Sequence, residues 1–271
     1  MNKRKPLKEL NLLDKFLFDE AMDDPENVKT MLDIILSQNT NLKHPPQTEK
    51  EQRTSTDNRQ IRLDVYAIDE DDVIYEVEAQ KENTHNLPKR SRLYQGIIDS
   101  KLLPPGVVDF NLLNEVLIVL IMPFDLFGYG LYRYTFQMKS EEVPELKLDD
   151  GATRIFLNTR GKHPDLVSPE LIELLKYMEH STDEISEACE SKRIQEMHRR
   201  VCQIKASEKA EVKYMQTWEE KILIKQEGER IGLERINRLN QKLIEQGRFD
   251  DLTKATSDSS YQEKLLKEFK I

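Results

Sequence analysis

The chain has 271 residues, enough for one large domain or two small ones and enough to bury a core without disulfide bonds. Hydrophobic residues make up 38% of it and charged residues 34%, with 9 glycines and 11 prolines, which excludes collagen-like, low-complexity and wholly disordered proteins. The formal net charge of -9 excludes binding to nucleic acid or membrane through bulk positive charge. A phosphate-binding surface must therefore be a local patch.

Cysteine usage and hydropathy indicate a cytoplasmic protein. Cys189 and Cys202 are the only cysteines, so the chain has neither a disulfide framework nor the paired cysteines of a zinc motif. The basic start, residues 1–10, is followed by no long apolar segment, so we expect no secretory signal. The longest apolar run, 116–122, is far shorter than the ~18 residues of a membrane span. We therefore expect no membrane association.

Two helices are expected near the start of the chain. Apolar residues recur at three- and four-residue steps between 10 and 21, which places one apolar stripe on a first helix. Asp24 followed by Pro25 is typical of a helix start, and the helical pattern continues over 25–35. The stretch 37–60 is almost devoid of apolar side chains, which predicts a loop or a solvated edge ribbon.

A pair of strands follows this polar stretch. Apolar and polar residues alternate in two segments, 62–67 and 73–80, on either side of an acidic turn. In an antiparallel pair, the residue numbers of two directly opposite residues add up to a constant. This sum must be even if the two apolar sets are to share one face. The same parity places Asp64 on the face of Glu76 and Glu78, and a three-residue turn sets Asp64 directly opposite Glu78.

The remaining pattern predicts an α/β domain followed by helices. A helix is expected over 87–103, and strands over 115–122, 131–138 and 154–157. The strand at 115–122 is apolar on both faces, as expected of a central strand that is covered on both sides. Beyond residue 168 the pattern is helical. We therefore predict a mixed central sheet with flanking helices over 1–165 and an all-helical region over 166–271.

The acidic residues of the strand pair are candidate metal ligands. Like charges opposite each other in a sheet destabilise it by up to about 1 kcal/mol per pair. A divalent cation between two carboxylates reverses this effect, and oxygen ligands of this kind suit Mg²⁺ or Mn²⁺. Asp64 and Glu78 therefore point to a metal site for phosphodiester hydrolysis. In the alternative interpretation, Glu76 and Glu78 only form a solvated strand face.

Several motifs resemble those of the PD-(D/E)xK nuclease family transposases of bacteria, also called recombination-promoting nucleases. The motifs at the predicted site are Arg62-Leu63-Asp64-Val65, Glu78-Ala79-Gln80 and Arg92-x-Tyr94-Gln95. Similar motifs follow at Phe124-Asp125-Leu126-Phe127-Gly128, Tyr134-Thr135-Phe136 and Ile155-Phe156-Leu157-Asn158-Thr159-x-Gly161. The resemblance extends over roughly residues 10 to 180.

The resemblance implies a restriction-endonuclease-like fold with an α-β-β-β-α-β core, and a Mg²⁺-dependent endonuclease that hydrolyses DNA. It assigns Asp64 and Glu78 as metal ligands and the backbone carbonyl of Ala79 as a third. The superfamily motif often ends in lysine, but this chain has Gln80. Because a neutral amide cannot act as a base, Gln80 is expected to orient the attacking water by hydrogen bonding.

The resemblance also leads us to expect a further metal ligand from the first helix. The candidate acids there are Asp14, Asp19 and Glu20. We prefer Glu20, because Leu13 and Leu17 define the buried stripe and Glu20 lies beside it.

A local basic patch downstream of the strand pair is the expected DNA-binding surface. It consists of Lys81, Lys89, Arg90 and Arg92, and Gln95, on the same helix face as Arg92, is expected as a further DNA contact. Contacts from such residues to phosphates are independent of sequence and sensitive to salt. In the alternative interpretation these side chains only solvate a helix or pair with neighbouring acids.

The helical region and Gln80 suggest a second function. The amphipathic turns over 239–271 predict self-association, so the protein is a possible homo-oligomer through its C-terminal helices. A catalytically degenerate relative acting as a helical scaffold or partner-binding protein is therefore the alternative to the enzyme. Gln80 and the negative net charge favour the scaffold, whereas the Asp64 and Glu78 pair favours the enzyme.

Overall fold

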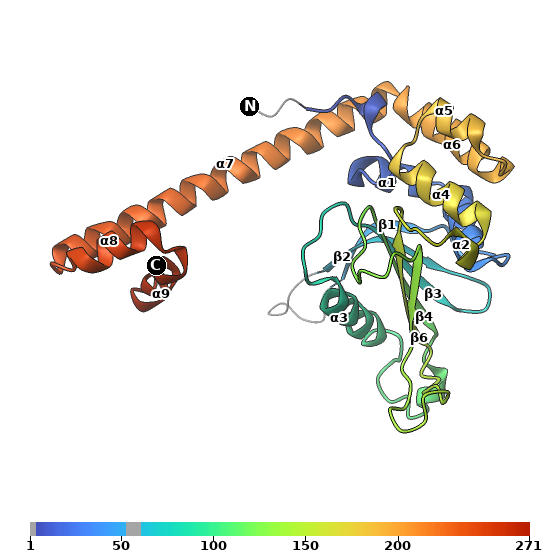
Figure 1. Ribbon diagram of the computed structural model, residues 1–271, viewed down its shortest axis with the longest axis horizontal. Helices are drawn as coiled ribbons and strands as arrows, with labels where there is room; N and C mark the ends of the chain where they lie inside the picture. Colours follow the sequence, from blue (N-terminus) through green and yellow to red (C-terminus); the bar gives the residue numbers. More distant parts are fainter. Residues whose placement is uncertain (1–3, 53–60) are drawn as a thin grey trace. The chain divides into compact units, whose positions relative to one another are not determined.

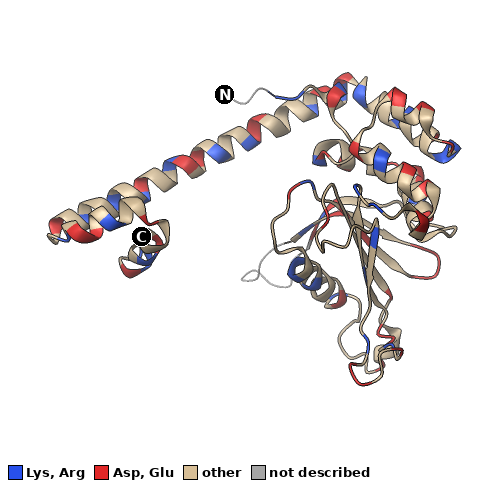
Figure 2. Ribbon diagram, viewed as in Figure 1, with Lys and Arg blue, Asp and Glu red and all other residues tan. Residues whose placement is uncertain are grey.

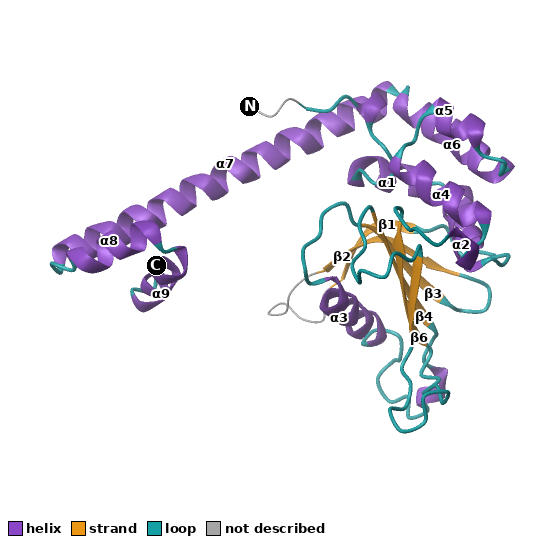
Figure 3. Cartoon of the chain, in the orientation of Figure 1, coloured by secondary structure: helices purple, strands orange, loops and turns teal. Residues whose placement is uncertain are grey.

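The protein combines an α/β unit with a mostly helical C-terminal region (Figure 1). A computed structural model describes residues 4–52 and 61–271. The chain divides into two compact units, Met1–Glu211 and Val212–Ile271. The first unit contains a six-stranded sheet with helices on its faces (Figure 3). The expected mixed central sheet flanked by helices is confirmed.

The helices and strands occur in the order that the sequence pattern predicts. The helices of the first unit are α1 (Lys15–Met22), α2 (Pro25–Leu36), α3 (Leu87–Asp99), α4 (Pro169–Glu179), α5 (Asp183–Ala188) and α6 (Lys192–Lys205). The strands are β1 (Gln47–Gln52), β2 (Ile61–Ile68), β3 (Ile74–Ala79), β4 (Val116–Met122), β5 (Arg133–Phe136) and β6 (Ala152–Asn158). Short 3-10 helices lie at Leu7–Glu9, Phe110–Leu112 and Pro164–Leu166.

The sheet is mixed, with strand order β1-β2-β3-β4-β6-β5. Strands β1, β2 and β3 are antiparallel neighbours, β3, β4 and β6 are parallel, and β5 pairs with β6 in the antiparallel sense. Strand β4 lies inside the sheet and is buried along nearly its whole length, as its continuous apolar run predicts. Strand β1 is an edge strand, which confirms the solvated edge ribbon within 37–60.

The register of β2 and β3 agrees with the expected parity. Val65 pairs with Val77 and Tyr66 with Glu76, so the numbers of opposite residues have an even sum. The pairing ends at Val65 and Val77, one residue short of Asp64 and Glu78, and Leu63 lies in the same buried cluster as Tyr66.

Asp69 fixes this register by organising the turn. Its carboxylate accepts hydrogen bonds from the backbone N–H of Asp71 at 3.0 Å and of Val73 at 2.9 Å, and from the hydroxyl of Tyr75 at 2.7 Å. The backbone N–H of Asp69 donates to the carbonyl of Val73 at 3.1 Å, which closes a three-residue turn. Since a slip of one residue reverses every side chain of a strand, this turn helps to hold the acids together.

We predict that Asp69→Ala lowers the free energy of unfolding by about 2 kcal/mol, because it leaves the buried hydroxyl of Tyr75 and two part-buried backbone N–H groups without their acceptor. Urea denaturation measures the change. Glu70→Ala is the matched control, since Glu70 is an exposed residue of the same turn, and it should change stability by less than about 0.5 kcal/mol. Equal stability of the two variants would contradict the role given to Asp69.

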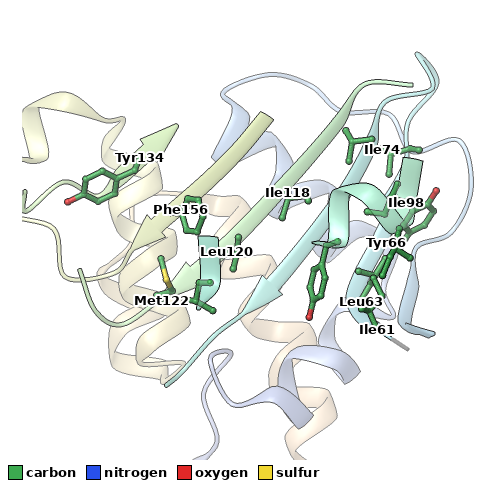
Figure 4. Packing of buried hydrophobic residues seen from close by; sticks show 14 residues of the cluster. Ile61, Leu63, Tyr66, Ile74, Ile98, Ile118, Leu120, Met122, Tyr134 and Phe156 are labelled. Atoms are coloured by element: carbon green, nitrogen blue, oxygen red, sulfur yellow. The ribbon is translucent and has the colours of Figure 1, made fainter. Parts of the chain in front are cut away.

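The face of the sheet that carries the acids lies under α3. In the parallel pairing of β3 with β4, Glu76 is opposite Ile118 and Glu78 is opposite Leu120, so these side chains share a face. The buried cluster on this face joins β4 and β6 to α3 (Figure 4). Glu76 is 0% exposed and Glu78 is 8% exposed. The alternative of a solvated strand face is therefore wrong, because α3 covers the acids.

The helices after the sheet belong to the first unit. Helices α4, α5 and α6 pack against one another. Helix α6 contacts α1, and both α4 and α6 contact α2. The backbone N–H of Leu12 donates to the hydroxyl of Ser181 at 2.9 Å, and that of Leu13 donates to the carbonyl of Met178 at 3.1 Å. The boundary expected at residue 165 thus lies within a compact unit that continues to Glu211.

The second unit is a small helical assembly. It contains most of α7 (Glu208–Glu245), together with α8 (Phe249–Ser257) and α9 (Ser259–Glu268). Its buried core consists of Leu239, Leu243, Ala255 and Leu265. The amphipathic turns expected over 239–271 therefore pack within the unit itself. No helix in residues 4–52 and 61–271 is long and apolar enough to cross a membrane.

Two of the later sequence motifs have structural roles. The carboxylate of Asp125 accepts hydrogen bonds from the backbone N–H of Gly130 at 2.6 Å and the hydroxyl of Tyr134 at 2.7 Å, which shapes the turn before β5. A Cβ atom added at Gly161 would lie 2.4 Å from the ring of Tyr132, so only glycine fits there. These motifs stabilise the sheet and do not contribute side chains to the acidic site.

Candidate metal centre

Arginine 90 of α3 links two of the predicted site residues. Its Nη2 atom donates to Glu78 Oε1 at 2.5 Å and to Gln80 Oε1 at 2.5 Å. Glu78 lies near the end of β3 and Gln80 follows the strand, so alternation aims both side chains to the α3 side of the sheet. Glu78 and Gln80 thus lie at one site, as the sequence predicts.

The first helix supplies a second cation and a further acid. Lys15 Nζ donates to Asp64 Oδ1 at 2.6 Å and to Asp19 Oδ1 at 3.0 Å. Lys15 and Asp19 are one helical turn apart on α1, so they share a face of that helix. The helix acid linked to Asp64 is therefore Asp19, the neighbour of the preferred Glu20.

Glu76 is the most deeply buried acid of the site. Both of its carboxylate oxygens, and Oε2 of Glu78, are buried without a hydrogen-bond partner among the described residues. Burying a polar atom without a partner costs about 1–3 kcal/mol, and more when the atom carries a charge. The fold gains nothing from such an arrangement, so these oxygens are available to a ligand.

The site raises the pKa values of its acids. Burial raises the pKa of Glu78 to about 7, with Arg90 opposing the shift and the charge of Asp64 adding to it. Burial, followed by the charges of Glu78 and Asp64, raises the pKa of Glu76 well above its ordinary value. Burial likewise raises the pKa of Asp19 to about 7, although Lys15 lowers it. Burial is the largest cause of the shift for all three of these acids, Asp19, Glu76 and Glu78.

The charges of the site match a divalent cation. Four acids, Asp19, Asp64, Glu76 and Glu78, are set against two cations, Lys15 and Arg90. Acids outnumber cations at the site, and Glu49, whose carboxylate lies 4.0 Å from Lys15 Nζ, adds to the excess of negative charge. A bound Mg²⁺ or Mn²⁺ offsets such an excess, and carboxylate oxygens are the donors that these ions prefer. The donor types present therefore suit such an ion.

The carboxylates of the four acids do not converge on one point. In the described part of the chain, no three of the four acids bring carboxylate oxygens within 4.8 Å of one another. Lys15 and Arg90 instead hold Asp64 and Glu78 through separate ion pairs. A metal ion shared by these acids requires the ammonium and guanidinium groups to move away.

Two residues expected at the DNA-binding surface have other positions. Gln95 is buried, and its Nε2 atom donates to Asp99 Oδ1 at 2.8 Å, so it does not face a nucleic acid. Arg90 is only partly exposed and its guanidinium points inward to Glu78. Both positions follow because α3 packs on the sheet, so that one side of the helix faces the protein interior. Tyr94 packs in the core.

The other residues of the expected patch lie on the surface. Lys81, Lys89 and Arg92 are exposed. Lys81 follows β3 and forms an ion pair with Asp14, the residue before α1. Basic residues occur over the first turns of α3 (Figure 2). A smaller basic surface than expected thus lies next to the acids.

Sequence reasoning missed one member of the site, Lys15. It placed Glu76 on the face of Glu78 by parity, but the complete burial of Glu76 depended on α3. Asp19 was one of the three candidate acids near the first helix, and with Lys15 it has the helical i, i+4 spacing of an ion pair. Nothing in that spacing shows that Lys15 also reaches Asp64 on β2, because this contact joins elements far apart in the sequence.

Comparisons with protein-family models, with curated proteins and with solved structures give no match to this chain.

We predict that, with a chelator present, the free energy of unfolding falls as the pH rises. The pKa of Glu78 is raised from 4.5 to about 7 on folding, so its stabilising contribution is complete below pH 4.5 and is lost as the pH rises through 7. The loss due to Glu78 between pH 5 and 8 is about 3 kcal/mol. Urea denaturation at several pH values measures it.

Two variants and a metal ion sharpen this test. Glu78→Gln should reduce the pH dependence, with the remainder due to Glu76 and Asp19, whereas Glu82→Gln, which alters an exposed residue, should leave it unchanged. Mg²⁺ should restore stability at pH 8 more than at pH 5. A metal-free protein that is equally stable at both pH values would show that the buried acids do not control stability.

Proposed function

We propose that the chain is a Mg²⁺-dependent endonuclease that hydrolyses phosphodiester bonds in DNA, of the PD-(D/E)xK type found in recombination-promoting nucleases. The order α1, α2, β1, β2, β3, α3, β4 contains the α-β-β-β-α-β order of a restriction-endonuclease-like core, with α2 as an additional helix before β1. The observation that carries the proposal is the buried group of acids on β2 and β3, with three carboxylate oxygens left unpartnered. Such a group costs stability, which is typical of a functional site.

The proposed roles follow from the chemistry of each side chain. Asp64 and Glu78 hold the metal ion, Mg²⁺ or Mn²⁺, together with the carbonyl of Ala79. When bound, the ion supplies a Lewis acid for the phosphate and lowers the pKa of a water molecule. Lys15 and Arg90, once released from their carboxylates, are positioned to balance the negative charge of the phosphate.

Gln80 is suited to orient the attacking water. Its Oε1 atom accepts from Arg90 at 2.5 Å, and its Nε2 atom donates to the carbonyl of Glu82, so the amide orientation is fixed. An amide oxygen has two lone pairs, and Arg90 uses one of them. The second can accept a hydrogen bond from water. Gln80 is therefore a positioning group and not a base.

The exposed basic residues supply the DNA contacts of the proposal. Lys81, Lys89 and Arg92 lie beside the site on the loop after β3 and on α3. Because side chains of this kind contact phosphates, we expect weak sequence preference and binding that weakens as salt increases.

We predict that the purified protein nicks supercoiled plasmid with Mg²⁺ or Mn²⁺ and loses this activity with a chelator. Asp64→Ala and Glu78→Ala should lower the rate at least about a hundredfold, since each removes a metal ligand. Gel electrophoresis of the plasmid measures the rate.

The control for this prediction is Glu82→Ala, which removes an exposed acid close in sequence and should retain full activity. Circular dichroism must show the same fold in every variant. Equal nicking by Asp64→Ala, Glu78→Ala and the unaltered protein would refute the catalytic assignment.

A second candidate function is a helical scaffold that evolved from such a nuclease. It is favoured by the ion pairs of Lys15 with Asp64 and Arg90 with Glu78, which neutralise both proposed metal ligands in the metal-free protein. Gln80, in place of lysine, fits the same interpretation. In this case the C-terminal helices carry the function, by self-association or by binding a partner.

The scaffold proposal predicts an oligomer that depends on α7. Leu223, Ile224 and Leu233 are large apolar side chains on this helix and are exposed in the single chain. Light scattering after size exclusion should give a multiple of the 31.9 kDa chain mass, and replacing both Leu223 and Ile224 by lysine should return it to the monomer. A monomeric unaltered protein would contradict self-association.

A further inference from the structure

A second group of possible metal ligands lies in the helices after the sheet. His198 and Cys202 are one turn apart on α6, and Asp183 is the first residue of α5. His198 Nε2 is 2.8 Å from Asp183 Oδ1 and 3.3 Å from Cys202 Sγ, and Asp183 Oδ1 is 3.9 Å from Cys202 Sγ. Within residues 4–52 and 61–271, this is the one set of three histidine, cysteine or acidic residues whose ligand atoms lie within 4.8 Å of one another.

The arrangement differs from that of a catalytic cysteine. In a nucleophilic triad, one ring nitrogen of histidine faces the nucleophile and the other faces the acid. Here the thiol and the carboxylate both approach Nε2 of His198 most closely. Three ligand atoms that converge on one point, instead of forming a chain, are typical of a metal site.

The distances also fit a tetrahedral ion. Zinc bonds of about 2.0–2.2 Å to nitrogen or oxygen and about 2.3 Å to sulfur place neighbouring ligand atoms of a tetrahedron about 3.3–3.6 Å apart. The three distances in the group, 2.8, 3.3 and 3.9 Å, lie on either side of this range. Shifts of about half an ångström in the side chains are enough to reach it, and Asp183 is free to make them because its side chain is 84% exposed.

Tyr177 orients the histidine for this role. Its hydroxyl lies 3.0 Å from His198 Nδ1, and Tyr177 is fully buried, so its position is fixed by packing. When Nδ1–H donates to this hydroxyl, the lone pair of the neutral ring is on Nε2 and faces the other two ligands. A hydrogen bond to the second ring nitrogen is a regular feature of histidine metal ligands.

We propose that Asp183, His198 and Cys202 bind a zinc-class divalent ion, with water as the fourth ligand, and that the ion joins α5 to α6. A thiolate and an imidazole select zinc over Mg²⁺, which prefers oxygen alone, so this site is chemically distinct from the acids of β2 and β3. The thiol proton of Cys202 passes to solvent when the ion binds. The proposal does not depend on nuclease activity.

Cobalt is the probe for this site, because Co²⁺ replaces Zn²⁺ in such sites and a thiolate bound to it absorbs in the near ultraviolet. The full-length protein, titrated with Co²⁺, should develop this absorption at one ion per chain and lose it when Zn²⁺ is added. Cys202→Ala should abolish the absorption. Cys189→Ala, which removes the only other thiol, should retain it.

Two further variants test the geometry. Asp183→Asn changes an exposed ligand, and Tyr177→Phe removes only the hydroxyl that faces His198, so both should fold and bind Co²⁺ at least about tenfold more weakly. Zn²⁺ should raise the melting temperature of the unaltered protein and leave that of Cys202→Ala unchanged. Absence of the absorption in the unaltered protein, or its persistence in Cys202→Ala, would overturn the proposal.

Discussion

The structure depends on how four acids are accommodated under α3 and beside α1. Glu76 and Glu78 lie in the interior of the first unit, where the repulsion between carboxylates is weakly screened. Lys15 and Arg90 offset part of this repulsion from opposite sides, one from α1 and one from α3. The two helices are thus joined to the sheet by charge as well as by apolar packing.

This balance links stability to the proposed chemistry. Glu76 and Glu78 retain buried carboxylate oxygens that no described residue hydrogen-bonds, so Lys15 and Arg90 compensate only part of the negative charge. Protons or a divalent cation can supply the missing positive charge, and the choice between them depends on pH. Burying carboxylates without partners costs free energy on folding. An ion that binds these carboxylates offsets that cost and so stabilises the folded state.

Local pattern was sufficient to predict much of the fold. The even parity of the strand pair, the central position of 115–122 and the helix start at Asp24 all depend on neighbouring residues, which a sequence displays directly. The roles of Arg90 and Gln95 were not predictable in this way. Their positions depend on which side of α3 meets the sheet, and that is set by the packing of Tyr94, Ile97 and Ile98.

Contacts between distant segments explain the other differences. Lys15 reaches Asp64 across 49 positions of the chain, and the spacing of α1 gives no sign of it. The group at Asp183, His198 and Cys202 has a visible component, a histidine and a cysteine one turn apart, but its acid comes from the preceding helix. The C-terminal end of the first unit was not predictable either. The composition changes near residue 166, but the helices beyond it still pack within the same unit.

The backbone contacts between the segment before α1 and the end of α4 have a practical consequence for dividing the chain. Leu12 and Leu13 are held by Ser181 and Met178, so the helix that presents Lys15 to Asp64 is braced by residues beyond the sheet. A fragment that ends at residue 165 retains Asp64, Glu78 and Ala79, the proposed ligands of the acidic site, but removes this brace. The shortest expression fragment that preserves the site in its native setting therefore extends through α6 to Glu211.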